Sequence, residues 1–487
     1  MEGTLERDRE AGEPRRTLVR GVAATARTRL AHAALCGATL ALVVAFASTA
    51  AAASKHPAKK HKRTPPPPEL ALSPQAGVSG AAIAMPPVGV SIEYPVMAAD
   101  LGHGECPPPA LAAELQRLGS PPLQLAGQSQ DFTVPASAAP VTPQSWEELT
   151  SYPLGAEFWF RLKCLLATTH DPLTAGLNMR LGQLVWAEQM VAGATAAAGS
   201  GVGFSIGNEP DLYYLPDYYQ LGKPQAGEEA LMVNLYLRAA AAIRPALGTA
   251  PLTGPELAGP SRWRASLPRV ISTLGVRTVG VHAYPLSVCT TPRAATISGL
   301  LSPSVGTEPA RLAWVVADAR AAGAQAVITE ANSVSCGGKA GVSDTPAAAV
   351  WALRFVLTAL KTGFGEVRFH FSGDPYDPFY VNGSEVVRRP IEGAMVALNQ
   401  WLPTGATLRS LPSRGGIAVT AIAAPNESPR VLLDNGTVAA RQIVLRGVSI
   451  VGTQVFSASG AQPSLRPAKG GGVLVTLPAS TVLAVAY

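Results

Sequence analysis

The feature that most restricts the fold of this chain is an alternation of eight short apolar runs with helix-like stretches. Apolar runs of this length, separated by longer segments of helical periodicity, are typical of βα units. The expected strands cover residues 88–94, 122–128, 172–178, 202–210, 250–256, 276–285, 324–332 and 365–372, and the clearest helices cover 109–119, 183–198, 228–246, 309–322 and 345–361. Eight such units predict a closed (β/α)8 (TIM) barrel over residues 87–380, rather than an open sheet.

The pattern changes after about residue 380. The helical periodicity largely stops there, and short runs of β-forming residues alternate with turn residues, as in GIAVTAIAAP, RVLLDNG, RQIVLRG and GGVLVTLPASTVLAVAY. This arrangement predicts a C-terminal antiparallel β-sandwich over residues 381–487.

The N-terminal part of the chain reads as a targeting segment followed by a linker. An Arg-rich stretch precedes an uncharged apolar run from Leu30 to Ala53, so residues 1–53 are expected to be a signal peptide or an uncleaved membrane anchor. Residues 54–86 begin SKHPAKKHKRTPPPP, a basic and Pro-rich composition that favours an extended linker. We therefore expect an extracytoplasmic protein, either secreted or anchored to the cell membrane.

The positive charge of the chain is confined to this N-terminal part. Residues 1–63 contain twelve Lys and Arg and five Asp and Glu, a net charge of +7, whereas the whole chain carries +6. The remaining 424 residues therefore carry a net charge of −1. A nearly neutral folded part lacks the basic footprint of a nucleic-acid-binding protein.

Five cysteines fit an exported protein. Cys36 lies within the apolar run, which leaves Cys106, Cys164, Cys289 and Cys336 for the folded part. Because Cys289 and Cys336 follow the expected strands six and seven, they should emerge on neighbouring loops, and we predict a disulfide between them. Four unpaired buried thiols are the alternative.

Two glutamates stand where a barrel carries its chemistry. Reactive groups of such barrels project from the C-terminal ends of the strands. Glu209 ends the fourth expected strand in IGNEPD, and Glu330 ends the seventh in VITEANS. Glycoside hydrolysis needs two carboxyl groups, and retaining enzymes hold them about 5–5.5 Å apart. The sequence therefore predicts Glu209 as the acid/base and Glu330 as the nucleophile.

The residues beside Glu209 suit this role. Asn208 offers a hydrogen bond to a sugar hydroxyl, and Pro210 stiffens the turn that aims the acid. An ionised Glu330 nearby would raise the proton affinity of Glu209 and keep it protonated near neutral pH. A surface salt bridge or a helix cap is the alternative for a lone glutamate at a strand end.

The order of these motifs resembles glycoside hydrolase family 79, the heparanase and β-glucuronidase group of clan A. The resemblance spans most of residues 87–487. Motifs that match this family in order and spacing are GVSIEY, LQLAGQSQD, TAGLN, GNEPD, TGPELAG, HAYPL, ITEANS, SDTPAAAVW and LPASTVLAV.

The resemblance implies a role for several side chains. It places Tyr284 beside the nucleophile, and His282 and Glu93 in the wall of the sugar pocket. A buried structural histidine and a structural hydrogen bond remain the alternatives for the last two. It also implies that the backbone N–H groups of Gly337 and Gly338 hold a uronate carboxylate.

The chain departs from the family pattern near the same pocket. Gln124 and Ala126 stand in the neighbourhood of an arginine that is common in the family's second strand, and Ser335-Cys336 replaces an aromatic residue before the two glycines. These departures indicate that the donor site tolerates or prefers a sugar other than glucuronate.

The sequence thus predicts an exported retaining β-glycoside hydrolase, β-glucuronidase-like, that acts on an oligosaccharide, a polysaccharide or another glycoside. The alternatives are a clan A β-glucosidase or β-xylosidase, and a non-catalytic barrel that binds glycan. The chain has no HExxH, P-loop or Rossmann motif, and its GxSxG match, GFSIG at residues 203–207, lies within the fourth expected strand. We expect neither a metal ion nor an organic cofactor.

Overall fold

The computed structural model describes residues 66–73, 82–137, 152–179, 184–213 and 228–487. The expected signal peptide or anchor, residues 1–53, and the first part of the expected linker lie outside these ranges. Among the residues that are described, no helix is both long and apolar enough to cross a membrane.

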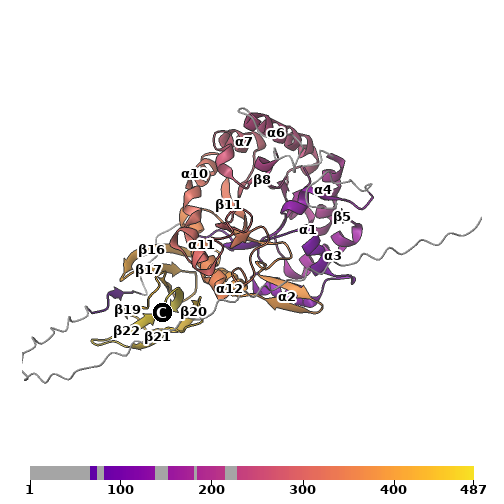
Figure 1. The fold of residues 1–487 in the computed structure, drawn as a ribbon. Helices are drawn as coiled ribbons and strands as arrows, with labels where there is room; N and C mark the ends of the chain where they lie inside the picture. Colours follow the sequence, from indigo (N-terminus) through magenta and orange to yellow (C-terminus); the bar gives the residue numbers. More distant parts are fainter. Residues whose placement is uncertain (1–65, 74–81, 138–151, 180–183, 214–227) are drawn as a thin grey trace, which may run out of the picture. The chain divides into compact units, whose positions relative to one another are not determined.

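Eight parallel strands close into a barrel, as the sequence predicts (Figure 1). The strands follow one another around the barrel in chain order, and the eighth pairs with the first. In chain order they are β2 (Val88–Ile92), β3 (Leu123–Leu125), β6 (Leu173–Leu177), β7 (Gly203–Ile206), β8 (Leu252–Leu257), β9 (Thr278–Ala283), β11 (Gln325–Ala331) and β13 (Val367–Phe371). These strands are almost wholly buried. Parallel strands that are covered on both faces need apolar side chains on both faces, which is why each appears in the sequence as a near-continuous apolar run.

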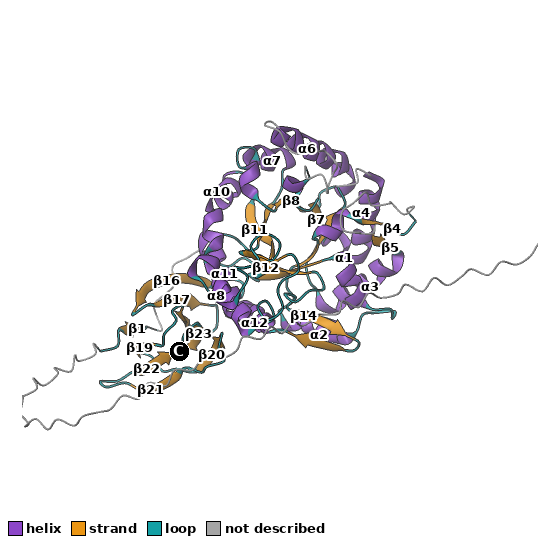
Figure 2. Ribbon diagram, in the orientation of Figure 1, coloured by secondary structure: helices purple, strands orange, loops and turns teal. Residues whose placement is uncertain are grey.

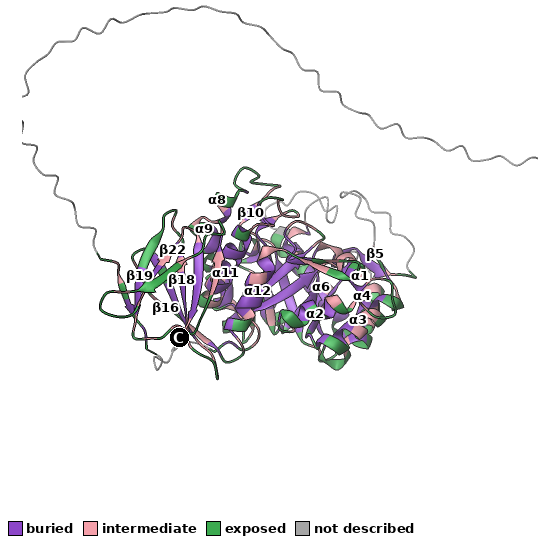
Figure 3. Ribbon diagram, turned by 90° about the horizontal axis from the view of Figure 1, so that it is seen from below, coloured by how far each residue is buried: buried purple, intermediate pink, exposed green. Residues whose placement is uncertain are grey.

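Helices surround the barrel strands (Figure 2). The longer ones are α1 (Tyr94–Leu101), α2 (Pro109–Arg117), α3 (Ala156–Thr169), α4 (Leu184–Ala198), α6 (Glu228–Leu247), α7 (Leu267–Leu274), α10 (Ala313–Ala321), α11 (Pro346–Thr362) and α12 (Pro390–Trp401). Helix α7, for example, buries Leu267, Val270, Ile271 and Leu274 at helical spacing. Figure 3 shows the buried strands within helices whose outer faces are exposed.

The barrel extends beyond the expected boundary at residue 380. Helix α12 packs against α11 and β2, and the side chain of Asn399 accepts from the Val88 N–H at 3.0 Å and donates to the Leu118 carbonyl at 2.8 Å. The β-rich region therefore begins at Thr407, not at residue 381. The periodic apolar residues of α12 gave a signal, but the intervening hairpin of β14 (Phe379–Asn382) and β15 (Glu385–Arg388) obscured it.

The C-terminal region consists of two packed sheets, as the sequence predicts. One is a five-stranded antiparallel sheet and the other has four strands. The first contains, in spatial order, β16 (Thr407–Arg414), β17 (Ile417–Ala423), β18 (Arg430–Asn435), β23 (Thr481–Ala486) and β20 (Gly452–Ser457). The second contains β1 (Glu69–Ala71), β19 (Arg441–Arg446), β22 (Val473–Leu477) and β21 (Ser464–Pro467).

Strand β1 is a second departure from the expected boundaries, because it lies within the expected linker of residues 54–86. It pairs in parallel with β19, with Leu70 opposite Leu445. Leu70 and Leu72 are buried in the core of the sandwich. Two leucines at alternating positions supply enough apolar surface to add a short strand, which a Pro-rich composition did not indicate.

The five-stranded sheet is buried on both faces. In β18, Val431 and Leu433 point into the sandwich core, whereas Leu432 packs into the cluster of the barrel. This alternation follows from the two-residue period of a strand. On the barrel side, Arg354 of α11 also forms an ion pair with Asp434, with Nη2 2.7 Å from Oδ1.

Candidate active site

Glu209 lies on a turn after β7 that is tied to the neighbouring strand. The backbone of Glu209 is left-handed (φ 48°, ψ 52°), a conformation that is uncommon for residues other than glycine. Two residues later, the Asp211 carboxylate accepts hydrogen bonds from the N–H groups of Ala258 and Gly259 at 2.9 and 2.8 Å. Because these bonds fix the turn to the loop after β8, the surroundings hold the strained position of Glu209.

Glu330 lies within β11, at an irregularity in the strand pairing. Ile328 is opposite Val281 of β9, and Glu330 is opposite His282, so one residue of β11 has no counterpart. A bulge of this kind re-aims a side chain. Here it brings Glu330 level with His282 at the mouth of the barrel.

His282 lies between the two glutamates. Its Nδ1 is 2.9 Å from Glu209 Oε1 and 3.7 Å from Glu330 Oε2. The contacting atoms of these three residues all lie within 4.8 Å of one another. This spacing matches the roughly 5–5.5 Å between carboxyl groups in retaining glycosidases and is shorter than the roughly 6.5–9.5 Å of inverting enzymes.

Glu330 has one oxygen held and one oxygen directed at two imidazoles. The Tyr284 hydroxyl donates to Glu330 Oε1 at 2.7 Å. Within the described ranges Oε2 forms no hydrogen bond, and the nearest imidazole nitrogens, of His282 and His370, are 3.7 and 3.6 Å away. Oε2 is therefore the carboxylate oxygen without a hydrogen bond, and it is also buried from solvent.

His370, in β13, connects Glu330 to Glu93. Its Nε2 lies 3.4 Å from Glu93 Oε1, and the Glu93 carboxylate also accepts from the N–H groups of Gln128 and Ser129 at 3.0 and 2.7 Å. A side chain at Gly127 would collide with Glu93 and His370, so glycine there permits this close packing. Glu93 thus forms the structural hydrogen bonds that were the alternative to a sugar-binding role. Its contact with a sugar remains a prediction.

The sequence analysis missed His370 and Asp211. His370 occurs in VRFHF, which was interpreted only as a strand. A polar residue next to the C-terminal end of a barrel strand was the available signal. Asp211 follows the Asn-Glu-Pro motif directly, but its partners are backbone groups of another loop, which no sequence pattern reveals.

Charges around Glu330 lower its proton affinity. Burial alone would raise the pKa of Glu330, but the positive charges of His282 and His370 and the Tyr284 hydrogen bond lower it below its ordinary value. Burial also opposes the charged form of each histidine, but the nearby carboxylates outweigh it and raise the pKa of His282 to about 10 and that of His370 to about 9. Near neutral pH the site thus holds an ionised Glu330 between two imidazolium groups.

Glu209 responds in the opposite direction. Burial raises the pKa of Glu209, and the charge of Glu330 raises it further, against the opposing effect of His282. A raised pKa at Glu209 beside a lowered pKa at Glu330 is the difference that an acid and a nucleophile require.

Glu209, His282 and Glu330 also form a set of three possible metal ligands. A histidine binds a metal ion through its neutral imidazole. With a pKa of about 10, His282 carries its proton near neutral pH and donates toward the carboxylates. Binding of a metal ion at these three residues would have to displace this proton.

The other predicted binding residues lie close by. Asn208 is buried, and its N–H donates to Asp131 at 3.2 Å. Gly337 and Gly338 both have positive φ angles, of 83° and 80°, in the turn after β12 (Val334–Ser335). No sugar contact of these three residues is tested, so their binding roles remain predictions.

Gln124, one of the departures from the family pattern, lies in the buried interior of the barrel. It donates to Glu256 at 2.7 Å and accepts from Arg368 of β13. Arg368 also forms an ion pair with Glu366, with Nε 2.8 Å from Oε1. An arginine side chain thus contacts position 124, but it belongs to the eighth barrel strand and not to the second, where the family pattern has its arginine.

The predicted disulfide is present. Cys289 and Cys336 are bonded, with their Cα atoms 6.2 Å apart. The bridge lies beside a two-stranded parallel pairing of β10 (Leu286–Ser287) with β12. A second disulfide, which was not predicted, joins Cys106 to Cys164.

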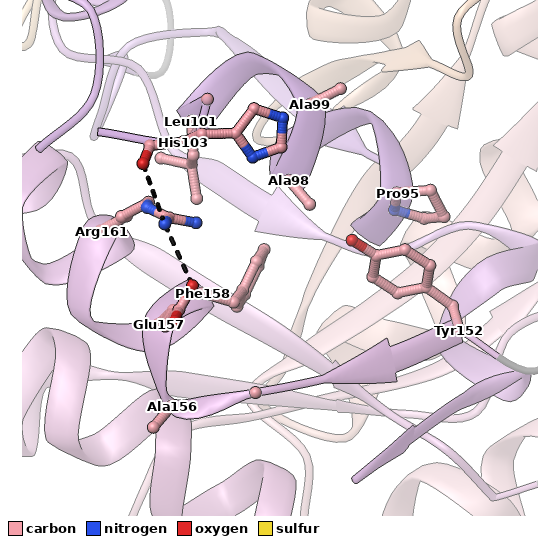
Figure 4. Close-up of a pocket in the computed structure, with 12 residues that line it drawn as sticks. Pro95, Ala98, Ala99, Leu101, His103, Tyr152, Ala156, Glu157, Phe158 and Arg161 are labelled. Carbon is pink, nitrogen blue, oxygen red and sulfur yellow. Dashed lines mark hydrogen bonds and ion pairs between the residues drawn. The ribbon is translucent and has the colours of Figure 1, made fainter. Parts of the chain in front are cut away.

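A cavity of about 670 Å³ lies apart from the two glutamates (Figure 4). Residues of α1, of the segment after it and of α3 line it, and its polar groups include Tyr152, His103, Glu157 and Arg161. Arg161 is already engaged with Glu157 and with the Gly104 carbonyl, at 3.1 and 2.7 Å. Neither glutamate lines this cavity, so it is not the candidate active site.

Solved structures share this fold. No protein-family model matches the chain, and no curated protein matches it in sequence. A 4-O-α-L-rhamnosyl-β-D-glucuronidase from Fusarium oxysporum is 22% identical, with a TM-score of 0.60 over 84% of this chain and 97% of that chain. A family 51 α-L-arabinofuranosidase from Bifidobacterium longum is 14% identical, with a TM-score of 0.62 over 87% and 99%. A family 30 endoxylanase from Clostridium papyrosolvens is 14% identical, with a TM-score of 0.50 over 84% and 97%.

Proposed function

We propose that this chain is a retaining β-glycoside hydrolase in which Glu330 is the nucleophile and Glu209 is the acid/base. The observation that carries the proposal is the arrangement of Glu209, His282 and Glu330, with the contacting atoms within 4.8 Å and opposite pKa shifts on the two glutamates. The shared fold with hydrolases of three different substrates supports a glycosidase.

The first half of the reaction forms a glycosyl ester. A carboxylate oxygen of Glu330 attacks the anomeric carbon, the bond from that carbon to the leaving oxygen breaks, and the proton of Glu209 passes to the leaving oxygen. Tyr284 holds Oε1, so the attacking oxygen keeps a fixed direction. The positive charges of His282 and His370 keep Glu330 ionised until it attacks.

The second half hydrolyses the ester. Once Glu330 is esterified its negative charge is gone, so its contribution to the raised pKa of Glu209 is lost. The pKa of Glu209 therefore falls, and the carboxylate left after proton donation stays ionised. It takes a proton from water, and the water oxygen attacks the anomeric carbon as the ester bond to Glu330 breaks. Two inversions at one carbon retain its configuration.

A panel of aryl β-glycosides tests this proposal. Wild-type protein should hydrolyse at least one of the glucuronide, the glucoside and the xyloside, and Glu330→Gln should abolish that activity. Glu188→Gln is the matched control, because it makes the same chemical change on an exposed position of α4. A wild-type protein that turns over no member of the panel would instead favour a glycan-binding barrel.

We also propose that the protein acts outside the cytoplasm, either secreted or anchored by its apolar N-terminal segment. Both disulfides support this, because such bonds persist in oxidising compartments. Fractionation of the producing cells, with mass spectrometry of the N-terminus, tests it. Recovery of the protein only from the cytoplasm with free thiols would contradict it.

A further inference from the structure

A further carboxylate, that of Asp374, lies beside the glycine turn that follows β12. It belongs to the loop after β13 and is half-buried. A Cβ atom added to Gly337 would lie 3.0–3.1 Å from the carboxylate atoms of Asp374. The Asp374 carboxylate therefore packs directly against the backbone of this turn.

Hydrogen bonds hold Asp374 in this position. Ser372 Oγ lies 2.5 Å from Asp374 Oδ2 and 2.7 Å from the Tyr376 hydroxyl. Because a serine hydroxyl has one proton, the consistent arrangement is that Tyr376 donates to Ser372 and Ser372 donates to Asp374. Asp377 fixes the backbone beneath, because its carboxylate accepts from the N–H groups of Ser372, Gly373 and Asp374 at 2.9–3.2 Å.

Tyr376 connects this loop to the nucleophile. Its ring centroid lies 6.3 Å from that of Tyr284 and 6.1 Å from that of His370. These are two of the groups that face Glu330, at 2.7 and 3.6 Å. Tyr376, Ser372 and Asp374 thus form a chain of contacts that begins beside the groups around Glu330.

We propose that Asp374 selects the donor sugar, accepting a hydrogen bond from a hydroxyl of a neutral sugar and excluding a uronic acid. This inference rests on the proposed function and names the substrate class of the same site. A sugar carboxylate here would meet a second carboxylate at a half-buried position, where like charges repel. A neutral hydroxymethyl group instead supplies the Asp374 carboxylate with a second donor beside Ser372.

Non-hydrolysable ligands test this selection without turnover. The probes are 4-nitrophenyl 1-thio-β-D-glucoside and 4-nitrophenyl 1-thio-β-D-glucuronide, which differ only in the substituent on carbon 5. Their Kd values are measured by calorimetry with wild-type protein, Asp374→Asn and Asp318→Asn. Asp318 is the matched control, because the same loss of charge occurs on α10, outside the barrel.

We expect wild-type protein to bind the glucoside about tenfold or more tightly than the glucuronide, as a charge of the same sign predicts. Asp374→Asn should shift this ratio toward the glucuronide by about tenfold, because asparagine keeps an acceptor oxygen but removes the charge. Asp318→Asn should leave the ratio unchanged. A retained affinity of Asp374→Asn for the glucoside shows that the variant is folded.

Three results would overturn the inference. They are tighter binding of the glucuronide by wild-type protein, a ratio that moves less than threefold in Asp374→Asn, and a wild-type protein that binds neither probe. Failure of the proposed function is measured separately. It would appear as no hydrolysis of the oxygen-linked glycosides, whatever the binding of the two thioglycosides.

Discussion

The surroundings of Glu209 and Glu330 differ although the two side chains lie close together. Among the described residues, Glu209 has one ionisable partner within 3 Å, His282. Glu330 has the Tyr284 hydroxyl at 2.7 Å and an imidazole on each side, at 3.6 and 3.7 Å. Two residues of the same type thus acquire different proton affinities from the number of donors that face them.

The two glutamates also differ in how the backbone holds them. Glu330 belongs to a strand that is paired on both sides, whereas Glu209 lies on a left-handed turn held by Asp211. A nucleophile has to stay at a fixed angle to the anomeric carbon, whereas a residue that gives and later takes a proton needs only hydrogen-bond reach. The backbone arrangement matches this division of labour.

Loss of the nucleophile should have the largest effect. Replacing Glu330 with glycine should lower turnover of an aryl glycoside by about four orders of magnitude, since the covalent route is lost. Added azide should then restore part of the rate and give a glycosyl azide of inverted configuration. The same experiment with Glu209→Gly should give a retained azide, because Glu330 still forms the ester. Identical products from the two variants would break the comparison.

Loss of the acid should have a smaller effect that depends on the leaving group. Glu209→Gln should slow hydrolysis of a poor leaving group by about 10²–10⁴-fold. A dinitrophenyl glycoside, whose leaving group needs no proton, should lose much less in the first step. The basic limb of the pH–rate profile should also disappear. Equal losses for both leaving groups would remove Glu209 as the general acid.

Removing the Tyr284 hydroxyl should shift one limb of the pH–rate profile. The hydrogen bond from Tyr284 helps to lower the pKa of Glu330, so Tyr284→Phe should raise that pKa. Because Glu330 must be ionised to attack, activity should fall at a higher pH as the solution is acidified. We expect kcat to fall by roughly tenfold at neutral pH, the equivalent of one charged hydrogen bond. An unchanged acidic limb would contradict this role.

The two histidines should have distinct and smaller effects. His370 lowers the pKa of Glu330, whereas His282 lowers the pKa values of both Glu330 and Glu209. His370→Gln should therefore move only the acidic limb to higher pH, and His282→Gln should move both limbs to higher pH. Complete pH–rate profiles of the two variants check this. Indistinguishable profiles would show that the two imidazoles are not divided in this way.

Much of the fold could be predicted from the sequence because each barrel strand is a short, continuous apolar run. The predicted domain boundaries were wrong where they depended on a short or ambiguous element. Leu70 and Leu72 form a sandwich strand inside a Pro-rich stretch, and α12 follows a hairpin that looked like the start of the sandwich. Both elements are defined by what they pack against, which local periodicity does not report.

The candidate site could be predicted in part. Glu209 and Glu330 stood out because each is a carboxylate beside the C-terminal end of an apolar strand. The surroundings that divide their roles come from other strands and loops: His370 from the eighth strand, and Asp374 from a loop without a motif. Their importance depends on distances between segments far apart in the chain, which sequence spacing alone does not contain.

The configuration of the first product tests the central claim most directly. Proton NMR can follow hydrolysis of whichever β-glycoside of the panel is turned over, before the released sugar equilibrates. Two carboxyl groups this close, with the pKa of Glu209 raised and that of Glu330 lowered, predict that the β-anomer of the sugar appears first and that the α-anomer grows in later by mutarotation. Initial release of the α-anomer would mean a single displacement by water and would contradict the assignment of Glu330 as nucleophile.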